Sequence, residues 1–261
     1  MVKLNKIANF LENIAPSCLA EDYDNVGLLI GDNDKSISKI LVALDADEAV
    51  VNEAKNKKCD LVISHHPLIF KPLKKVVTDD SVSRTVIDLI KNDISLISIH
   101  TNFDSVKSGL CDLFLDKIAD TKERTAIEGD EENGLGRIAQ LTNPAKLSDI
   151  LETVRREYKI DALRYVGNPQ TVINKIAVCN GGGADFIYSA AAQGADIYIS
   201  GDIKYHHARF AYENGISLIE IPHYNAEIIF CDYIKEILKK EFGDELDICT
   251  TDQNIDVWNI F

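Results

Sequence analysis

Six histidines are confined to four short segments of this 261-residue chain, and three of these segments also contain a carboxylate. Imidazole nitrogen and carboxylate oxygen are ligands that divalent metal ions of borderline or hard character prefer. Their grouping therefore predicts a metal site that holds one or more ions. The segments are Ser64-His65-His66-Pro67, His100-Thr101-Asn102-Phe103-Asp104, Gly201-Asp202-Ile203-Lys204-Tyr205-His206-His207 and His223-Tyr224-Asn225-Ala226-Glu227.

The elements that precede these segments are predicted to be strands of parallel α/β sheets. In the first half of the chain, strand, helix and strand patterns follow one another with the spacing of β-α-β units. Ligands collect at the carboxyl ends of such strands, and His65, His66 and His100 come directly after two of them. The predicted strands are 39–44, 61–63 and 95–99, and the predicted helices are 47–57 and 81–92.

A second α/β block is predicted after the polar, glycine-containing stretch at 123–137, which suits a linker or an exposed hairpin. Two of its strands again end at histidine-containing segments, so a strand terminus is the recurring position of the candidate ligands. Its predicted elements are a helix at 147–158, strands at 162–166 and 175–179, a helix at 185–193, strands at 196–200 and 216–221, and a helix from 223 to about 242.

The adjacent pair His65 and His66 favours two ions rather than one. Neighbouring side chains of an extended segment point to opposite sides, so each ring would reach its own ion if the chain turns at Pro67. The alternative is that both are loop histidines with no ligand role.

The other two pairs also have competing interpretations. Asp104, four residues after His100, is either a ligand or the N-cap of a helix that starts near Ser105. His223 and Glu227 are four residues apart at the start of a helix, so they share one face and can reach one ion. A carboxylate placed beside two cations can bridge them, which makes Glu227 the candidate bridging ligand.

Two further motifs are less specific. The run Gly181-Gly182-Gly183 could present backbone N–H groups to a phosphate, but no Lys-Ser or Lys-Thr follows and Asp185 would repel an anion. A tight strand-to-helix turn is the preferred interpretation. Of His206 and His207, one is expected to line the pocket and the other to be a surface or interface residue.

Composition narrows the class of protein. The formal charge of −14 disfavours binding to nucleic acid, and no apolar run is long enough to span a bilayer. The N-terminus lacks the apolar core of a signal peptide and predicts an amphipathic helix. The six widely spaced cysteines never form a CxxC motif, so we expect reduced, mostly buried thiols and a cytoplasmic location.

Taken in order, these motifs resemble one family, the GTP cyclohydrolase 1 type 2 homologues, also called the Nif-three-like family. The resemblance covers nearly the whole chain. Besides the four histidine segments, it rests on Tyr23-Asp24-Asn25-Val26-Gly27-Leu28, Leu44-Asp45 and Gly134-Leu135-Gly136-Arg137.

The resemblance implies two divalent ions per subunit, whose identity the ligand types leave open among zinc, manganese, iron and nickel. It also implies two interlocked α/β domains with mostly parallel sheets and assembly into a toroidal homohexamer. The first domain is expected at 1–122, completed by 223–261, and the second at 123–222. The ligands carried over by motif are His65, His66, Asp104, His223 and Glu227.

The function expected from this site is hydrolysis of a nucleotide or phosphoester by a pair of metal ions. His100 and His206 are candidates for the general acid or base that such a reaction requires. The family name suggests attack on the purine ring of GTP. The alternative is that the protein is not an enzyme but a hexameric metal-binding scaffold, in which the ions stabilise the ring or bind a partner protein.

Overall fold

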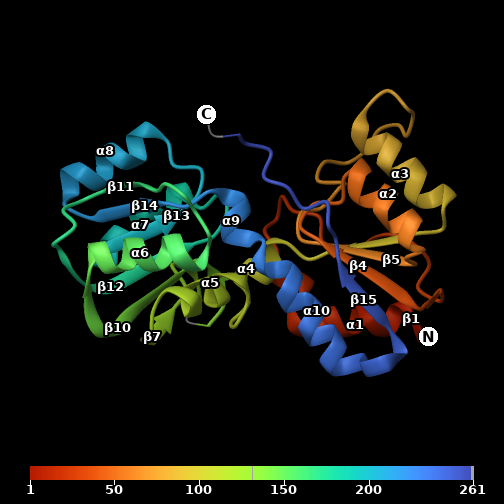
Figure 1. Cartoon of the computed structure of the whole chain (residues 1–261), viewed down its shortest axis with the longest axis horizontal. Helices are drawn as coiled ribbons and strands as arrows, with labels where there is room; N and C mark the ends of the chain where they lie inside the picture. Colours follow the sequence, from red (N-terminus) through yellow and green to blue (C-terminus); the bar gives the residue numbers. More distant parts are fainter. Residues whose placement is uncertain (131, 260–261) are drawn as a thin grey trace. The chain divides into compact units, whose positions relative to one another are not determined.

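The computed structural model describes residues 1–130 and 132–259, which form two compact units (Figure 1). The first unit comprises Met1–Phe103 and the segment from Phe230 onward, and the second comprises Asp104–Ile229. The expected division was similar, but it assigned residues 104–122 and 223–229 to the first domain. They belong to the second because Phe114 and Leu115 are part of its core and strand β7 (Thr121–Thr125) pairs with its sheet.

The first unit is built around a five-stranded sheet of order β15-β4-β5-β6-β2, in which only the β2–β6 pair is antiparallel. This mostly parallel sheet is the one that the alternating patterns predicted. Its strands are β2 (Gly27–Ile30), β4 (Lys39–Ala43), β5 (Leu61–Ser64), β6 (Ser95–Ser98) and β15 (Asp247–Thr250), and a small ladder joins β1 (Val2–Lys3) to β3 (Ser36–Ile37).

Helices cover both faces of this sheet. Figure 1 shows α2 and α3 on one face and α1 and α10 on the other. Fully buried strands such as β5 are explained by this double cover, since neither face meets water. The helical elements are α1 (Leu4–Ile14), η1 (Ser17–Leu19), α2 (Glu48–Lys57), α3 (Ser81–Lys91), α10 (Ile229–Phe242) and η3 (Gly243–Glu245), while α4 (Thr101–Ser105) begins in this unit and ends in the other.

Local sequence fixes where these helices begin. Asp47 and Asp80 accept hydrogen bonds from the first-turn N–H groups of α2 and α3, as N-cap residues do. The predicted N-terminal helix is present as α1, which buries Ile7 and Leu11 and places Phe10 against Phe242 with ring centroids 5.5 Å apart.

The second unit has a six-stranded sheet of order β11-β14-β13-β12-β10-β7. Its centre, β12-β13-β14, is parallel, but the pairs on either side are antiparallel. The strands are β7, β10 (Arg137–Lys146), β11 (Arg164–Val166), β12 (Val172–Cys179), β13 (Ile197–Ser200) and β14 (Ser217–Glu220), and β8 (Glu128–Gly129) with β9 (Gly134–Leu135) forms the hairpin anticipated at 123–137.

Two apolar clusters hold helices to the two faces of this second sheet. Ile150 of α6 and Phe114 of α5 pack with Ile197 and Ile199 of β13, whereas Ile187 of α7 packs with Tyr198 on the opposite face. The alternation of these three β13 residues between clusters is the period-2 pattern of a strand. The helices are α5 (Leu110–Ile118), α6 (Leu147–Glu157), η2 (Ala184–Phe186), α7 (Ile187–Ala192), α8 (Tyr205–Asn214) and α9 (His223–Glu227).

Within the described part of the chain, none of the helices combines the length and the apolar character needed to cross a bilayer. Four of the six cysteines are buried, as the expectation of mostly buried thiols requires.

Candidate metal centre

Three histidines of the first unit converge where β5 and β6 end. The chain turns directly after Ser64, since the backbone N–H groups of both His65 and His66 donate to the carbonyl of Leu44. The His65 ring centroid lies 5.1 Å from those of His66 and His100, and one ligand atom from each ring lies within 4.8 Å of the others. Adjacent rings therefore do not diverge here, and these three imidazoles can hold one ion together.

Each of these rings is oriented by an oxygen atom at its Nδ1. Such an acceptor holds the proton on Nδ1 and makes Nε2 the nitrogen that would bind an ion, as an oxygen partner does for most metal-binding histidines. The three oxygen partners, all at 2.9 Å, are the Ile99 carbonyl for His65, Asp45 for His66 and Asp24 for His100.

Asp24 is a site residue that sequence reasoning did not single out. Its side chain is fully buried and also accepts hydrogen bonds from the backbone N–H and the hydroxyl of Thr101. Burial alone would raise the pKa of this carboxyl, but the hydrogen bonds from His100 and Thr101 outweigh it and hold the pKa well below its usual range. An ionised Asp24 therefore faces His100 throughout the physiological pH range.

In the second unit, the buried carboxylates of Asp104 and Glu227 share one hydrogen-bond donor. The side-chain amide nitrogen of Asn180 lies 3.0 Å from Oδ1 of Asp104 and 3.2 Å from Oε1 of Glu227. Asp104 lies inside α4, and the next helix, α5, has Gly109 as its N-cap. The alternative interpretation of Asp104 as a helix cap is therefore wrong, because no helix begins at Ser105.

His223 and Glu227 share one face of α9, as their spacing predicted. Nε2 of His223 lies 3.0 Å from Oε2 of Glu227, and its Nδ1 lies 2.9 Å from Asp202. Burial lowers the pKa of His223, but the two carboxylates more than compensate and raise the pKa to about 9. Asp202 thus orients the candidate ligand His223 in the way that Asp45 orients His66.

The glycine run after β12 lies against these ligands. Gly181 has a φ of +60°, and a Cβ at this position would lie 2.0 Å from Oε1 of Glu227 and 3.1 Å from Nε2 of His223. Glycine is needed here both for the left-handed backbone and for the close approach. The preferred interpretation as a tight turn is retained, with the added reason that the turn packs on the ligand pair.

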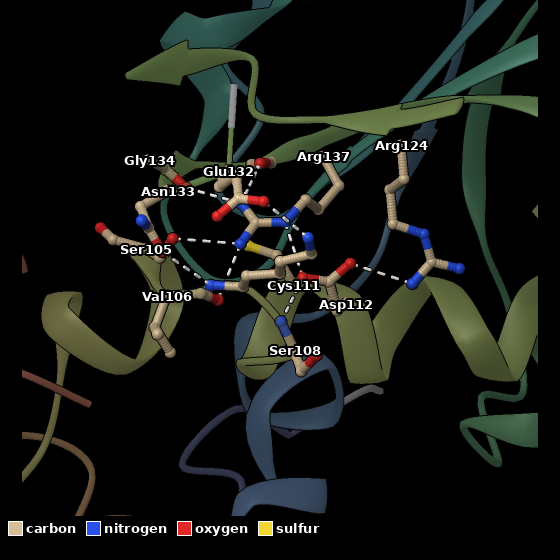
Figure 2. Close-up of polar contacts among 12 residues, drawn as sticks. Ser105, Val106, Ser108, Cys111, Asp112, Arg124, Glu132, Asn133, Gly134 and Arg137 are labelled. Atoms are coloured by element: carbon tan, nitrogen blue, oxygen red, sulfur yellow. Dashed lines mark hydrogen bonds and ion pairs between the residues drawn. The ribbon is translucent and has the colours of Figure 1, made fainter. Parts of the chain in front are cut away.

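The backbone next to Asp104 is held by a buried arginine. Figure 2 shows the guanidinium of Arg137 directed at the carbonyls of Ser105 and Val106, which lie 3.0 and 2.7 Å from its Nη2. Its Nε donates to Asp112 at 2.7 Å, and Asp112 also accepts from Arg124. Because Arg137 is only 2% exposed, this ion network fixes the chain that leads out of α4.

His206 and His207 form a separate group with Asp185. His207 is buried rather than at the surface: its Nδ1 accepts from the backbone N–H of Lys204, and its Nε2 lies 2.9 Å from Asp185. Since Nδ1 of His207 caps α8 and Nε2 is paired with Asp185, a ligand role for this ring would break one of these two interactions. His206 is exposed, and the structure groups it with these residues instead of with the five expected ligands.

Comparison with known proteins agrees with the motif resemblance. Residues 2–256 match the family described as Duf34/NIF3 (NGG1p interacting factor 3). A Clostridium perfringens protein named GTP cyclohydrolase 1 type 2 homolog is 40% identical over 94% of this chain and 95% of its own length. A Drosophila melanogaster protein named NIF3-like protein 1 is 32% identical over 93% of this chain and 84% of its own length.

Solved structures show the same fold. A hypothetical protein of Staphylococcus aureus superposes with a TM-score of 0.89 at 31% identity and covers 99% of both chains. A Bacillus cereus protein related to NIF3 superposes with a TM-score of 0.91 at 22% identity, over 100% of this chain and 99% of its own.

Proposed function

Because the chain belongs to the Duf34/NIF3 family, we propose that it is a metal-dependent hydrolase that acts on a nucleotide or phosphoester. Two divalent ions per subunit are bound by His65, His66, Asp104, His223 and Glu227. The observation that carries the proposal is that the rings of His65 and His66 converge in the first unit, each with an oxygen atom at its Nδ1.

That arrangement supports metal binding better than a structural role for the histidines. A neutral imidazole whose Nδ1 proton is held by an oxygen presents its basic Nε2 lone pair in a fixed direction, and such outer partners raise metal affinity by 10–100-fold. Imidazole ligands suit zinc, iron and nickel, and carboxylate ligands suit manganese, so these four metals are the candidates.

The second unit supports the proposal independently. Asp104 and Glu227 are buried to 8% and 3% exposure, although both are carboxylates that share one amide donor. Buried charges require compensation by opposite charge or coordination to a metal. In the metal-free protein the protonated ring of His223 supplies positive charge beside Glu227. A divalent ion would replace that charge, and the donor set of one imidazole and two carboxylates fits such an ion chemically.

When bound, the ions would supply positive charge that polarises a substrate oxygen or electrophilic centre and makes water a better nucleophile. The proton transfer that hydrolysis requires is assigned to His100. Asp24 holds the Nδ1 proton of this ring and stabilises the charged form that arises when Nε2 accepts a proton. This dyad gives His100 a stronger acid–base assignment than the exposed His206.

The substrate class is narrowed only by chemistry and by the names of the relatives. Curated relatives carry the name GTP cyclohydrolase 1 type 2 homolog, so the purine ring of GTP is one candidate. A phosphoester is equally suited to a pair of cations, which would neutralise its oxygens. We place the protein in the cytoplasm, where its six free thiols stay reduced.

The test begins with elemental analysis of protein purified without added metal, followed by a screen of nucleotides and phosphoesters with the metal found. Glu227→Gln should abolish turnover while the protein remains folded and assembled. An unchanged rate in this variant would overturn the catalytic assignment. If chelation dissolves the assembly and no substrate is turned over, the non-catalytic ring is the correct function.

We also propose that copies of the chain assemble into a toroidal homohexamer, as the family resemblance implies. Native mass spectrometry and analytical ultracentrifugation of the untagged protein measure this directly. A monomer or dimer at micromolar concentration would contradict the hexamer without affecting the metal site.

A further inference from the structure

Asn180 occupies a position in the second unit that neither the motifs nor the expected ligand set includes. It follows the last residue of β12 and is only 4% exposed. Both hydrogens of its amide group are directed at carboxylates, one from Asp104 and one from Glu227, at 3.0 and 3.2 Å. On its other side, the side-chain carbonyl accepts a hydrogen bond from the thiol of Cys111.

These three partners determine which way the amide faces. If the group were flipped, its oxygen would point at two carboxylate oxygens and its nitrogen at a thiol, which is a weak acceptor. The thiol of Cys111 therefore selects the orientation in which the amide nitrogen serves the carboxylates. A buried side chain with every polar group directed in this way is rigid and has one rotamer.

The chemical type of the residue matters as much as its place. A lysine here would neutralise the carboxylates and compete with a cation, while an aspartate would repel them. Serine or threonine offers a single hydrogen. Only a neutral amide donates to both carboxylates at once and leaves their full negative charge for an ion.

We propose that Asn180 is a positioning residue that holds Asp104 and Glu227 in the arrangement that binds a divalent ion. This inference rests on the proposed function only in taking these two carboxylates as metal ligands. The new point is that one donor at the end of β12 orients both carboxylates, although Asp104 comes from α4 and Glu227 from α9. Gly181 reinforces the arrangement, because its missing side chain lets the same turn pack against Glu227.

The experiment is a titration of the metal-free full-length protein with Mn²⁺ alone, read by the electron paramagnetic resonance signal of free Mn²⁺. Asn180→Ala should lower the affinity for one Mn²⁺ ion by about 10–100-fold, the usual effect of losing a residue that orients a metal ligand. The affinity for the other ion should stay within about threefold of that of the wild type. Asn180→Ser keeps one donor, so its Mn²⁺ affinity should lie between those of the wild type and Asn180→Ala. Selective loss of one ion is a result that a general loss of stability would not give.

Asn225→Ala is the matched control. Asn225 belongs to α9 with Glu227, but its amide donates to the carbonyl of Tyr158 at 3.1 Å instead of to a ligand. It should lose stability without any change in Mn²⁺ affinity. Asn180→Leu keeps the shape of the side chain without its donors and should repeat the Asn180→Ala result if the alanine variant fails to fold.

The outcomes separate the two proposals. If wild-type protein binds Mn²⁺ and the Asn180 variants bind every ion within threefold of wild type, the positioning role is wrong and the metal site stands. If the variants lose one ion but wild-type protein hydrolyses no nucleotide or phosphoester with any metal found in it, the hydrolase proposal fails and the positioning role stands. Absence of any bound ion in wild-type protein overturns both.

Discussion

Nε2 of His223 lies 3.0 Å from Oε2 of Glu227, one helical turn along α9, so the two candidate ligands are paired with each other in the metal-free protein. With Asp202 at the other ring nitrogen, this pairing raises the pKa of His223 to about 9. At neutral pH the ring is therefore protonated. An ion that binds at this nitrogen must first displace a proton.

The first prediction concerns the pH dependence of metal binding. Since only neutral imidazole binds a metal, affinity at His223 should rise about tenfold per pH unit up to pH 9 and level off above it. Mn²⁺ titrations from pH 6 to 9.5 measure this slope. Asp202→Asn removes one carboxylate that raises the pKa, so it should move the levelling-off point to lower pH. Affinity that levels off at the same pH in both proteins would refute the assignment.

The same pairing predicts how the stability of the metal-free protein depends on pH. The folded-state pKa of His223 lies above the unfolded value of 6.5, so its stabilising contribution is complete below pH 6.5 and is lost as pH rises through about 9. Melting temperatures of metal-free protein should fall across this window. The melting temperature of His223→Gln should fall less across this window. An identical fall in both proteins would mean that other groups cause the pH dependence.

A third prediction separates acid–base chemistry from metal binding at His100. The ring is close enough to His65 and His66 to be a third ligand, but Asp24 supports a role in proton transfer. We expect His100→Asn to keep the metal content of wild type and to lower kcat by about 10²–10⁴-fold, the usual contribution of a general acid or base. Asp24→Asn should lower kcat with KM unchanged. Loss of an ion in His100→Asn would make this histidine a ligand instead.

A fourth prediction concerns the buried network of Arg137. Arg137→Met leaves the carbonyls of Ser105 and Val106 without their donor and removes one partner of Asp112. The free energy of unfolding should fall by roughly 3–5 kcal/mol, as when a buried ion pair is broken. Urea denaturation of the metal-free protein measures this change. Arg209→Met, which breaks an exposed pair with Glu213, should cost less than about 1 kcal/mol, and an equal cost for both would contradict the ranking.

Strand-end motifs made much of the fold and part of the site predictable. Each predicted strand of the first sheet ends within a residue or two of its expected position because a fully buried strand is a short apolar run with clear limits. Strand β10 was not predicted, since its second half contains Asn143 and Pro144 and its pairing with β12 shifts register there. A bulged antiparallel strand of this kind lacks the period-2 pattern on which the prediction depends.

The residues that orient the ligands were harder to identify. Asp24 and His100 are 76 positions apart, as are Asn180 and Asp104. Neither pairing follows from local spacing, because it depends on how strand ends and loops meet in the folded unit. The motif resemblance did contain Asp24, so a useful signal was present: a carboxylate in a motif that lacks any histidine of its own.

The last prediction uses Gly181, whose backbone packs against Glu227. In Gly181→Ala the new Cβ would lie 2.0 Å from Oε1 of Glu227, so that carboxylate must move away from its position beside Asn180. Mn²⁺ affinity should fall by at least tenfold, comparable to the loss of an outer-shell partner. The residue must also keep a φ of +60°, which costs about 1–2 kcal/mol for a residue with a side chain.

Gly215→Ala isolates the backbone contribution. Gly215 ends α8 with a φ of +69°, and no heavy atom lies within 4 Å of a Cβ placed there. Both variants therefore carry similar backbone strain, but only the substitution at Gly181 displaces a candidate ligand. If both variants lose the same stability but only Gly181→Ala loses Mn²⁺ affinity, the loss of affinity is caused by the displacement of Glu227. If both variants bind Mn²⁺ like wild type, Glu227 does not bind the ion in the position that the structure gives it.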